Sequence, residues 1–402
     1  MKKILVLITT SFILSFSFSG CGTFPTSYDH IEDNKVRVID FTFEPCEAAP
    51  GDTVKMTALF AGRNVSMEDI DWTVAWKMAQ NGYGVTEPLD PQDIDYIEPP
   101  QQKKISDQMS AITFSFKVPE DIMVKSPMIP DDWTSQFPEA VRNNIPQYYK
   151  SMSKSELLNN FDVMINMLKS GAISTDSQMI SALPLLSQFL TVKFRVTANI
   201  KTAGFKVIRD YSVRYNSKLC EIPGVHVLKN NNPVIDSIGI FKVHVSNLSK
   251  FDTSKYKGEF TRLYGPQDIG LLRDSITPVV IDTGYSYYLF SYVRSEDSAW
   301  TVQSLLLNES VPRVEQFSSI WFYEMDDNEI SGVNPNDLMF LGGGDGKRIL
   351  PPLNAKVEHF TVWCKIKDQL IDEVNRPLGT AVIEGHGQFV YSQGYLNSIK
   401  SK

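Results

Sequence analysis

Histidines are the first residues to consider for acid–base catalysis or metal binding near neutral pH. No two histidines of this sequence are spaced i, i+2 or i, i+4, so the simple zinc motifs do not occur in it. One of them, His386, stands in Glu384–Gly387, an alternating segment that predicts a strand, and we expect a surface or turn position for it. The histidines are His30, His226, His244, His359 and His386.

Clustered carboxylates are the second group of residues that could do chemistry. The segment 326–337 contains Asp326, Asp327, Glu329 and Asp337. Oxygen ligands of this kind bind Ca²⁺, which takes about six to eight of them. The segment departs from the EF-hand pattern because no glutamate occupies the position of the bidentate ligand. We therefore weigh a calcium site against a solvated acidic rim, and we expect no other cofactor.

Two further segments have features of enzyme sites. A second acidic segment holds Asp90, Asp93, Asp95 and Glu98. A hydrolase using the acidic segments would need two carboxylates about 5–10 Å apart in a cleft. The glycine-rich segment 341–348 lacks the first glycine and the Ser or Thr of a phosphate-binding loop, so it predicts a hairpin turn. We therefore expect a protein that is not an enzyme, with a hydrolase as the less favoured alternative.

The N-terminus has the pattern of an export signal. Lys2 and Lys3 precede an apolar run over residues 4–18, which is too short and too polar to span a bilayer. The following Phe18-Ser19-Gly20-Cys21 resembles the lipobox of bacterial lipoproteins, although that family usually has Leu at the position of Phe18. The resemblance implies removal of residues 1–20, lipidation of Cys21 and membrane attachment, with Gly22 typical of outer-membrane sorting. The alternative is an ordinary secretory signal with an incidental cysteine.

The composition of the chain is that of a globular protein. Of its 402 residues, 42% are hydrophobic and 21% are charged, and the formal net charge is −8. We do not expect an acidic chain without clustered Lys and Arg to bind nucleic acid. Residues 21–35 are polar and aperiodic and predict a tether. Cys46 and Cys220 flank the strands expected in the first half and could form a disulfide bridge, whereas Cys364 is expected to be a buried thiol.

Alternating apolar residues predict strands through most of the chain. In the first half we expect strands at 36–43, 53–60, 70–76, 111–118, 191–200 and 205–215. After the linker signal Asn230–Pro233 we expect a similar series at 236–245, 285–293, 319–325, 357–366 and 381–391. Short strands, Gly/Pro turns and a tryptophan on the third strand resemble bacterial immunoglobulin-like domains. The resemblance implies a mostly β protein of two tandem antiparallel β-sandwiches, at residues 36–222 and 233–395.

Residues 120–190 depart from this pattern and predict a helical insertion in the first sandwich. Ser153-Lys154-Ser155-Glu156 is a capping box, apolar residues at helical spacing follow it, and a second helix is expected at 176–189. Met-rich apolar faces can adapt to partners, so we take Trp133, Phe161, Met164 and Leu168 as a candidate partner surface. The alternative is that these side chains pack on the sandwich as part of its core.

These features together indicate a non-catalytic, lipid-anchored envelope protein. It would present loops and the helical insertion to an unknown protein or cell-wall partner, and the membrane would be its other partner. A periplasmic binder of small molecules or glycans is the main alternative, and it requires a concave cavity lined by Phe161, Met164 and Leu168.

Overall fold

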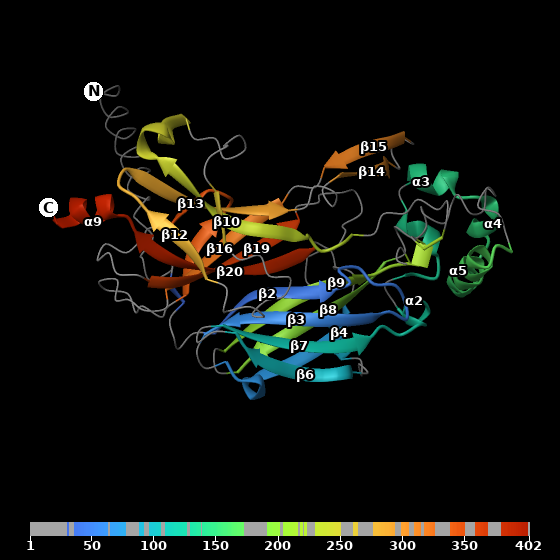
Figure 1. The fold of residues 1–402 in the computed structure, drawn as a ribbon. Coiled ribbons are helices and arrows are strands. Elements are labelled where there is room, and N and C mark those ends of the chain that lie inside the picture. The colour runs from blue at the N-terminus through green and yellow to red at the C-terminus, as the bar shows by residue number, and fades with distance from the viewer. Residues whose placement is uncertain are drawn as a thin grey trace, which may run out of the picture.

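The computed structural model shows a mostly β protein with several antiparallel sheets and a group of short helices at one end (Figure 1). The expected helix at 176–189, Cys21 and Cys220 lie outside the described residues. The structure describes residues 30–31, 36–62, 65–77, 88–91, 96–105, 109–126, 129–137, 139–172, 191–201, 204–215, 218–219, 221–222, 230–250, 260–263, 276–293, 299–304, 309–314, 317–325, 338–349, 358–368 and 379–400.

Two facing antiparallel sheets build the first half. One has the order β2-β3-β7-β6, from Arg37–Glu44, Thr53–Ala61, Met109–Lys117 and Tyr96–Lys104. The other has the order β5-β4-β8-β9, from Pro88–Pro91, Ile70–Lys77, Val192–Ile200 and Phe205–Val213. Their inner faces share one core, in which the ring centroid of Trp72 lies 5.3 Å from that of Phe114 and 5.9 Å from that of Phe41. The six strands expected in this half are confirmed.

Two facing sheets also build the second half. One has the order β1-β17-β16-β19-β20-β12, from His30–Ile31, Leu338–Gly343, Phe317–Met325, Glu358–Asp368, Thr380–Tyr391 and Thr277–Ile281. Its partner has the order β11-β10-β13-β18, from Phe260–Arg262, Ile235–His244, Tyr285–Val293 and Lys347–Ile349. Ile240 and Leu289 from one sheet share a core with Trp321 and Val362 from the other. The five strands expected here are confirmed.

Other elements were not expected from the sequence. β12 joins its sheet parallel to β20. A separate ribbon pairs β14 (Ala299–Ser304) with β15 (Glu309–Val314), and the helix α9 (Gln393–Lys400) follows β20. β6 lies at the edge of the described part of its sheet although it contains Pro99 and Pro100. These elements are short or rich in proline, so periodicity does not reveal them.

Part of the expected tether is a strand. His30 pairs with Met339 and Ile31 pairs with Leu338, so β1 extends the sheet of the second half next to β17. The tether assigned to 21–35 is corrected at these two residues, because their backbone groups are used in sheet pairing. The N-terminal segment is therefore attached to the second half before the chain enters the first half at β2.

An apolar cluster joins the two halves. Ile39, Leu59 and Met109 on the outer face of one sheet of the first half pack with Phe322 and Trp363 of the second half, and each is at most 7% exposed. Burial of a large apolar side chain contributes about 1.5–3 kcal/mol relative to leaving it exposed. Figure 1 shows β2 and β3 lying against the sheet that contains β19 and β20. The halves therefore share a buried interface.

Charged groups lie beside this cluster. Lys365 Nζ lies 2.8 Å from Asp40 Oδ1 and donates a hydrogen bond to the carbonyl oxygen of Ile39, also at 2.8 Å. Burial, together with the like charges of Arg209 and Lys365, lowers the pKa of Lys367. The interface therefore combines apolar burial with a buried ion pair that crosses between the halves.

The linker between the halves is a structured part of this joint. Asn230 donates to Asp368 Oδ2 at 3.0 Å, and Asn230 itself is only 4% exposed. The side chain of Asn232 donates to the carbonyl oxygen of Phe43 at 2.6 Å and accepts a hydrogen bond from the backbone N–H of Thr380 at 3.1 Å. One asparagine thus contacts both halves. Residues 230–233 are of types common in turns. Here the side chains of Asn230 and Asn232 form hydrogen bonds that fix the connection between the halves.

Candidate functional site

The helical insertion follows β7 and packs on one end of the first half (Figure 1). Its described elements are short, and only α5 exceeds two turns. Pro146 stands at the N-terminus of α4, a position that suits a residue without an N–H. The elements are α2 (Ile122–Lys125), η3 (Trp133–Gln136), α3 (Glu139–Asn144), α4 (Gln147–Lys150) and α5 (Lys154–Lys169).

The capping box expected before α5 is confirmed. Ser153 Oγ accepts a hydrogen bond from the backbone N–H of Glu156 at 3.3 Å, and Glu156 Oε2 accepts one from the backbone N–H of Ser153 at 2.8 Å. The hydrogen bonds from Ser153 lower the pKa of Glu156. The start of α5 is thus fixed by two reciprocal hydrogen bonds, which satisfy amides that a helix N-terminus leaves unpaired.

Aromatic side chains hold the insertion to the sheets. The ring of Phe161 in α5 stacks on Tyr215, which follows β9, with centroids 5.2 Å apart and planes 21° apart. Tyr149 is fully buried and donates to Met164 Sδ at 3.6 Å. Burial, and secondarily the neighbouring Tyr148, raises the pKa of Tyr149 to about 12. Tyr149 therefore remains neutral at physiological pH, and both tyrosines act as packing groups.

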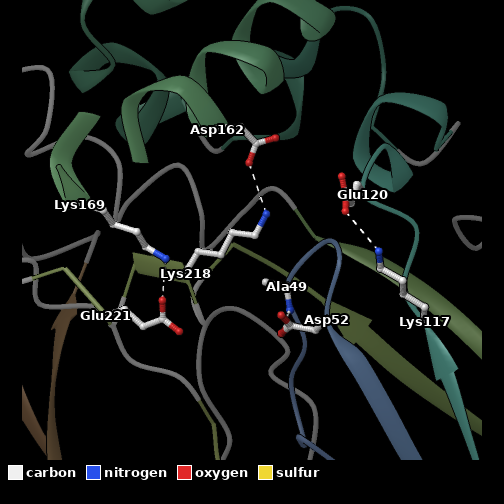
Figure 2. A network of polar contacts seen from close by, with 8 residues as sticks. All are labelled: Ala49, Asp52, Lys117, Glu120, Asp162, Lys169, Lys218 and Glu221. Atoms are coloured by element: carbon white, nitrogen blue, oxygen red, sulfur yellow. Dashed lines mark hydrogen bonds and ion pairs between the residues drawn. The ribbon is translucent and has the colours of Figure 1, made fainter. Parts of the chain in front are cut away.

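Ion pairs attach the outer side of α5 to the segment after β9 (Figure 2). Lys169 Nζ lies 2.6 Å from Glu221 Oε2, and Lys218 Nζ lies 3.5 Å from Asp162 Oδ1. Lys218 Nζ also lies 5.8 Å from the ring centroid of Tyr215, within cation–π range. Exposed pairs of this kind contribute about 0–1 kcal/mol each, so the aromatic packing supplies more of the attachment energy than they do.

The side chains taken as a candidate partner surface lie in the core. Trp133, Phe161, Met164 and Leu168 are 1%, 0%, 7% and 6% exposed and belong to the core cluster of the first half. Trp133 also donates through Nε1 to the carbonyl oxygen of Met152 at 3.0 Å. The structure brings the four side chains together, but they pack the insertion against the sheets. Their assignment as a partner surface is therefore corrected.

Other side chains of the insertion are exposed to solvent. Tyr148 and Val163 are each 53% exposed, and Met167 is 39% exposed. Val163 and Met167 are spaced i, i+4, so they lie on one face of α5, opposite its buried face. The sequence analysis did not select these residues because it chose the longest row of apolar residues along the helix. That row is the one that packs into the core.

The calcium candidates Asp326, Asp327, Glu329 and Asp337 lie outside the described residues, so this site stays a prediction. In the second acidic segment, Glu98 lies in β6 and accepts a hydrogen bond from Ser115 Oγ at 3.1 Å. Among the residues that the structure describes, no three His, Cys, Asp or Glu side chains are grouped closely enough to hold a metal ion.

The position expected for His386 is wrong. The residue is 7% exposed in the middle of β20, where its Nε2 lies 2.7 Å from Glu384 Oε1 and its Nδ1 lies 3.1 Å from Thr361 Oγ1. A hydroxyl, an imidazole and a carboxylate in this order are the groups of a catalytic triad. Thr361 is 3% exposed and Glu384 is fully buried, however, so a substrate cannot reach the hydroxyl. The three residues form a buried polar row on the sheet.

The glycine-rich segment 341–348 is not a hairpin turn. Its first residues belong to β17 and its last to β18, which lie in facing sheets, so the turn crosses from one sheet to the other. Asp345 in this turn accepts hydrogen bonds from Ser291 Oγ in β13 and Ser319 Oγ in β16, each at 2.9 Å. The turn therefore connects the two sheets, and Asp345 links it to a strand of each.

The described cysteines are buried. Cys46 receives a contact from Asn230 Nδ2 at 3.8 Å, next to the joint. A bridge to Cys220 stays a prediction, since that partner lies outside the described residues. Burial, reinforced by the nearby Asp345, raises the pKa of Cys364 well above its ordinary value. Cys364 is therefore a buried protonated thiol, as expected.

Comparisons with protein-family models and with curated proteins find no match to this chain. Within the described part of the chain, no helix combines the length and apolar character that crossing a bilayer requires.

Proposed function

We propose that this chain is a non-catalytic, lipid-anchored bacterial envelope protein that holds its helical insertion toward a protein or cell-wall partner. The observation that carries the proposal is the joint between the halves. Its apolar cluster and the pair of Lys365 with Asp40 fix the insertion relative to the second half, to which the N-terminal segment is attached through β1. Linked domains move relative to each other unless their interface is large and apolar, so such a joint suits a module that presents a surface.

The order of the strands supports a further proposal, that both halves are immunoglobulin-like sandwiches. The sheets β2-β3-β7-β6 and β5-β4-β8-β9 have the same orders along the chain as strands A-B-E-D and C′-C-F-G of that fold, which supports the proposal. In the second half, β10-β13-β18 and β17-β16-β19-β20 repeat the orders A-B-E and C′-C-F-G. Two copies of one order along the chain support an internal repeat.

The anchor in this proposal is a lipid on Cys21, with attachment to the outer membrane. Stable attachment through lipid takes more than one acyl chain, which the lipobox pattern would supply. Mass spectrometry of the mature protein is expected to show Cys21 as a lipid-modified first residue. The variant Cys21→Ala is expected to leave the membrane fraction. An unmodified wild-type product, or unchanged fractionation of Cys21→Ala, would contradict the anchor.

The contact role of the insertion needs a test of its own. We expect the triple variant Tyr148→Ser, Val163→Ser and Met167→Ser to lose crosslinks between the protein and its envelope partner in intact cells. Ile208→Ser is a matched control, because Ile208 is 52% exposed on β9, away from the insertion. Equal crosslinking by the triple variant and the control would contradict the role of the insertion.

The burial of Phe161, Met164 and Leu168 does not favour the small-molecule binder, whose cavity these side chains were to line. They pack against the sheets of the first half.

A further inference from the structure

The end of the second half that lies away from the joint is formed by three neighbouring segments. β10 ends at His244 and passes into η4 (Val245–Lys250), and the backbone N–H of Val245 donates to the carbonyl oxygen of Gly284 at 2.8 Å. The backbone N–H of Ser392, just before α9, donates to the carbonyl oxygen of Ile281 at 2.9 Å. We call the surface of residues 244–248, 280–285 and 393–400 the α9 end. Figure 1 shows α9 and β12 at the opposite end of the molecule from α3, α4 and α5.

The α9 end exposes apolar side chains from each of its segments. Val245 is 48% exposed, Val280 is 47%, Tyr285 is 38% and Ile399 is 37%. Isolated exposed apolar side chains are normal on a soluble surface, but their gathering on one end of a domain indicates a contact surface. Aliphatic side chains with a tyrosine are typical of surfaces that lie at a membrane interface.

Counted with the adjacent lysines, the segments of the α9 end carry a net positive charge, since Lys242, Lys250 and Lys400 stand against the one acid Asp282. The segments Val245–Lys250 and Gln393–Lys400 contain no acidic residue, and Lys400 is exposed in the last turn of α9. Asp282 is the acidic residue of 280–285, and it forms an ion pair with Lys242, whose hydrogen bond lowers the pKa of Asp282. The described residues of the α9 end thus carry no unpaired negative charge, although the chain as a whole carries −8.

We propose that the α9 end lies on the anionic lipid surface to which Cys21 is attached. This inference rests on the proposed lipidation. The nine residues from Cys21 to β1 reach at most about 30 Å when fully extended, so the lipid must insert close to the second half. Val245, Tyr285 and Ile399 would enter the headgroup region, and lysines would attract anionic lipid. The helical insertion then points away from the membrane.

Fluorescence quenching in vesicles tests this orientation. The full-length lipidated protein is reconstituted into vesicles of phosphatidylethanolamine and phosphatidylglycerol, with or without bromine on the shallow part of the acyl chains. The variant Tyr285→Trp adds a fluorophore at the α9 end. Tyr148→Trp is the matched control, since Tyr148 is 53% exposed on the insertion. We expect bromine to reduce the added emission of Tyr285→Trp at least about twofold, because interfacial side chains lie about 5–10 Å into the headgroup boundary, and to leave Tyr148→Trp unchanged.

The other outcomes separate the two proposals. If the protein has its lipid mass and floats with the vesicles but Tyr285→Trp is not quenched, the membrane contact of the α9 end is overturned and the anchor stands. Equal quenching of both variants also overturns the orientation. If the protein has no lipid and does not float, both proposals fail. Replacing phosphatidylglycerol by a neutral lipid is expected to weaken the quenching, and unchanged quenching would contradict the role of the lysines.

Discussion

Lys365 of the second half and Asp40 of the first half lie 2.8 Å apart between Nζ and Oδ1, and the side chain of Asp40 is only 2% exposed. The pair therefore crosses the joint with its carboxylate almost fully shielded from water, whereas the side chain of Lys365 is 17% exposed. A buried ion pair adds little net stability compared with apolar packing, because both charges lose their hydration. Loss of one partner, however, leaves the other charge buried and unpaired.

Replacement of Lys365 is expected to weaken the joint. The variant Lys365→Met keeps most of the side-chain length and should lower the free energy of unfolding by about 3–5 kcal/mol, because Asp40 remains buried without its partner. Denaturant unfolding followed by tryptophan fluorescence measures the effect. Lys117→Met is the control, since Lys117 pairs with Glu120 at the surface and should change stability by no more than about 0.5 kcal/mol. Equal effects of the two variants would show that the joint does not depend on the buried pair.

Truncation within α5 distinguishes its buried face from its exposed face. Phe161→Ala removes a fully buried ring that stacks on Tyr215 and should cost about 3–5 kcal/mol. Val163→Ala, two residues further on and 53% exposed, should cost less than about 0.5 kcal/mol. Thermal unfolding of both variants measures the difference. A mild effect of Phe161→Ala would indicate that the insertion is not packed on the sheets.

Acid is expected to weaken the start of α5. The pKa of Glu156 is lowered in the folded state by hydrogen bonds from Ser153. A lowered pKa means that the contribution to stability is present above the ordinary glutamate pKa, about 4.3, and is lost as the pH falls through the lowered value. Ser153→Ala should cost about 1 kcal/mol at pH 7, and its difference from the wild type should shrink at lower pH. Ser170→Ala at the other end of α5 is the control, and melting curves from pH 7 to pH 3 provide the test.

Glycine at position 387 gives the core of the second half its close packing. A Cβ atom there would lie 2.2 Å from Phe360 Cζ, and this ring cannot move away easily because it stacks on Phe389 with centroids 4.4 Å apart. Gly387→Ala should therefore destabilise the protein by about 1–3 kcal/mol. Gly394→Ala in α9 meets no atom within 4 Å and should be neutral or slightly stabilising. A neutral Gly387→Ala would contradict this packing.

The sequence predicted the central strands and α5 because each has a strong local signal. β3 alternates from Val54 to Phe60, and α5 begins with a capping box at Ser153. The short pairing of β1 has no such signal, since two residues of the segment 21–35 gain their partner only from β17. Similarly, the neighbouring sequence of Asn232 indicates only a turn. Its hydrogen bonds to Phe43 and Thr380 could not be predicted, because they depend on how the two halves pack together.

The candidate site was predicted less well than the fold. Trp133 and Phe161 were correctly grouped in one insertion, but periodicity shows only that a helix has an apolar face and does not show whether the core already covers that face. His386 was misplaced for a related reason. Because polar residues alternate along β20, the sequence placed His386 on a solvent-exposed face. The first half of the protein lies near that face of the sheet, so His386 is buried.

The strand β6, at the edge of the described part of its sheet, has a consequence for how copies of the protein meet at high concentration. Pro99 and Pro100 carry no amide hydrogen to offer a neighbouring molecule, and Lys103 and Lys104 are exposed further along the strand. An edge with missing donors and like charges does not readily join the edge of another sheet. Molecules that stand side by side at high density can therefore remain separate and do not merge into extended β aggregates.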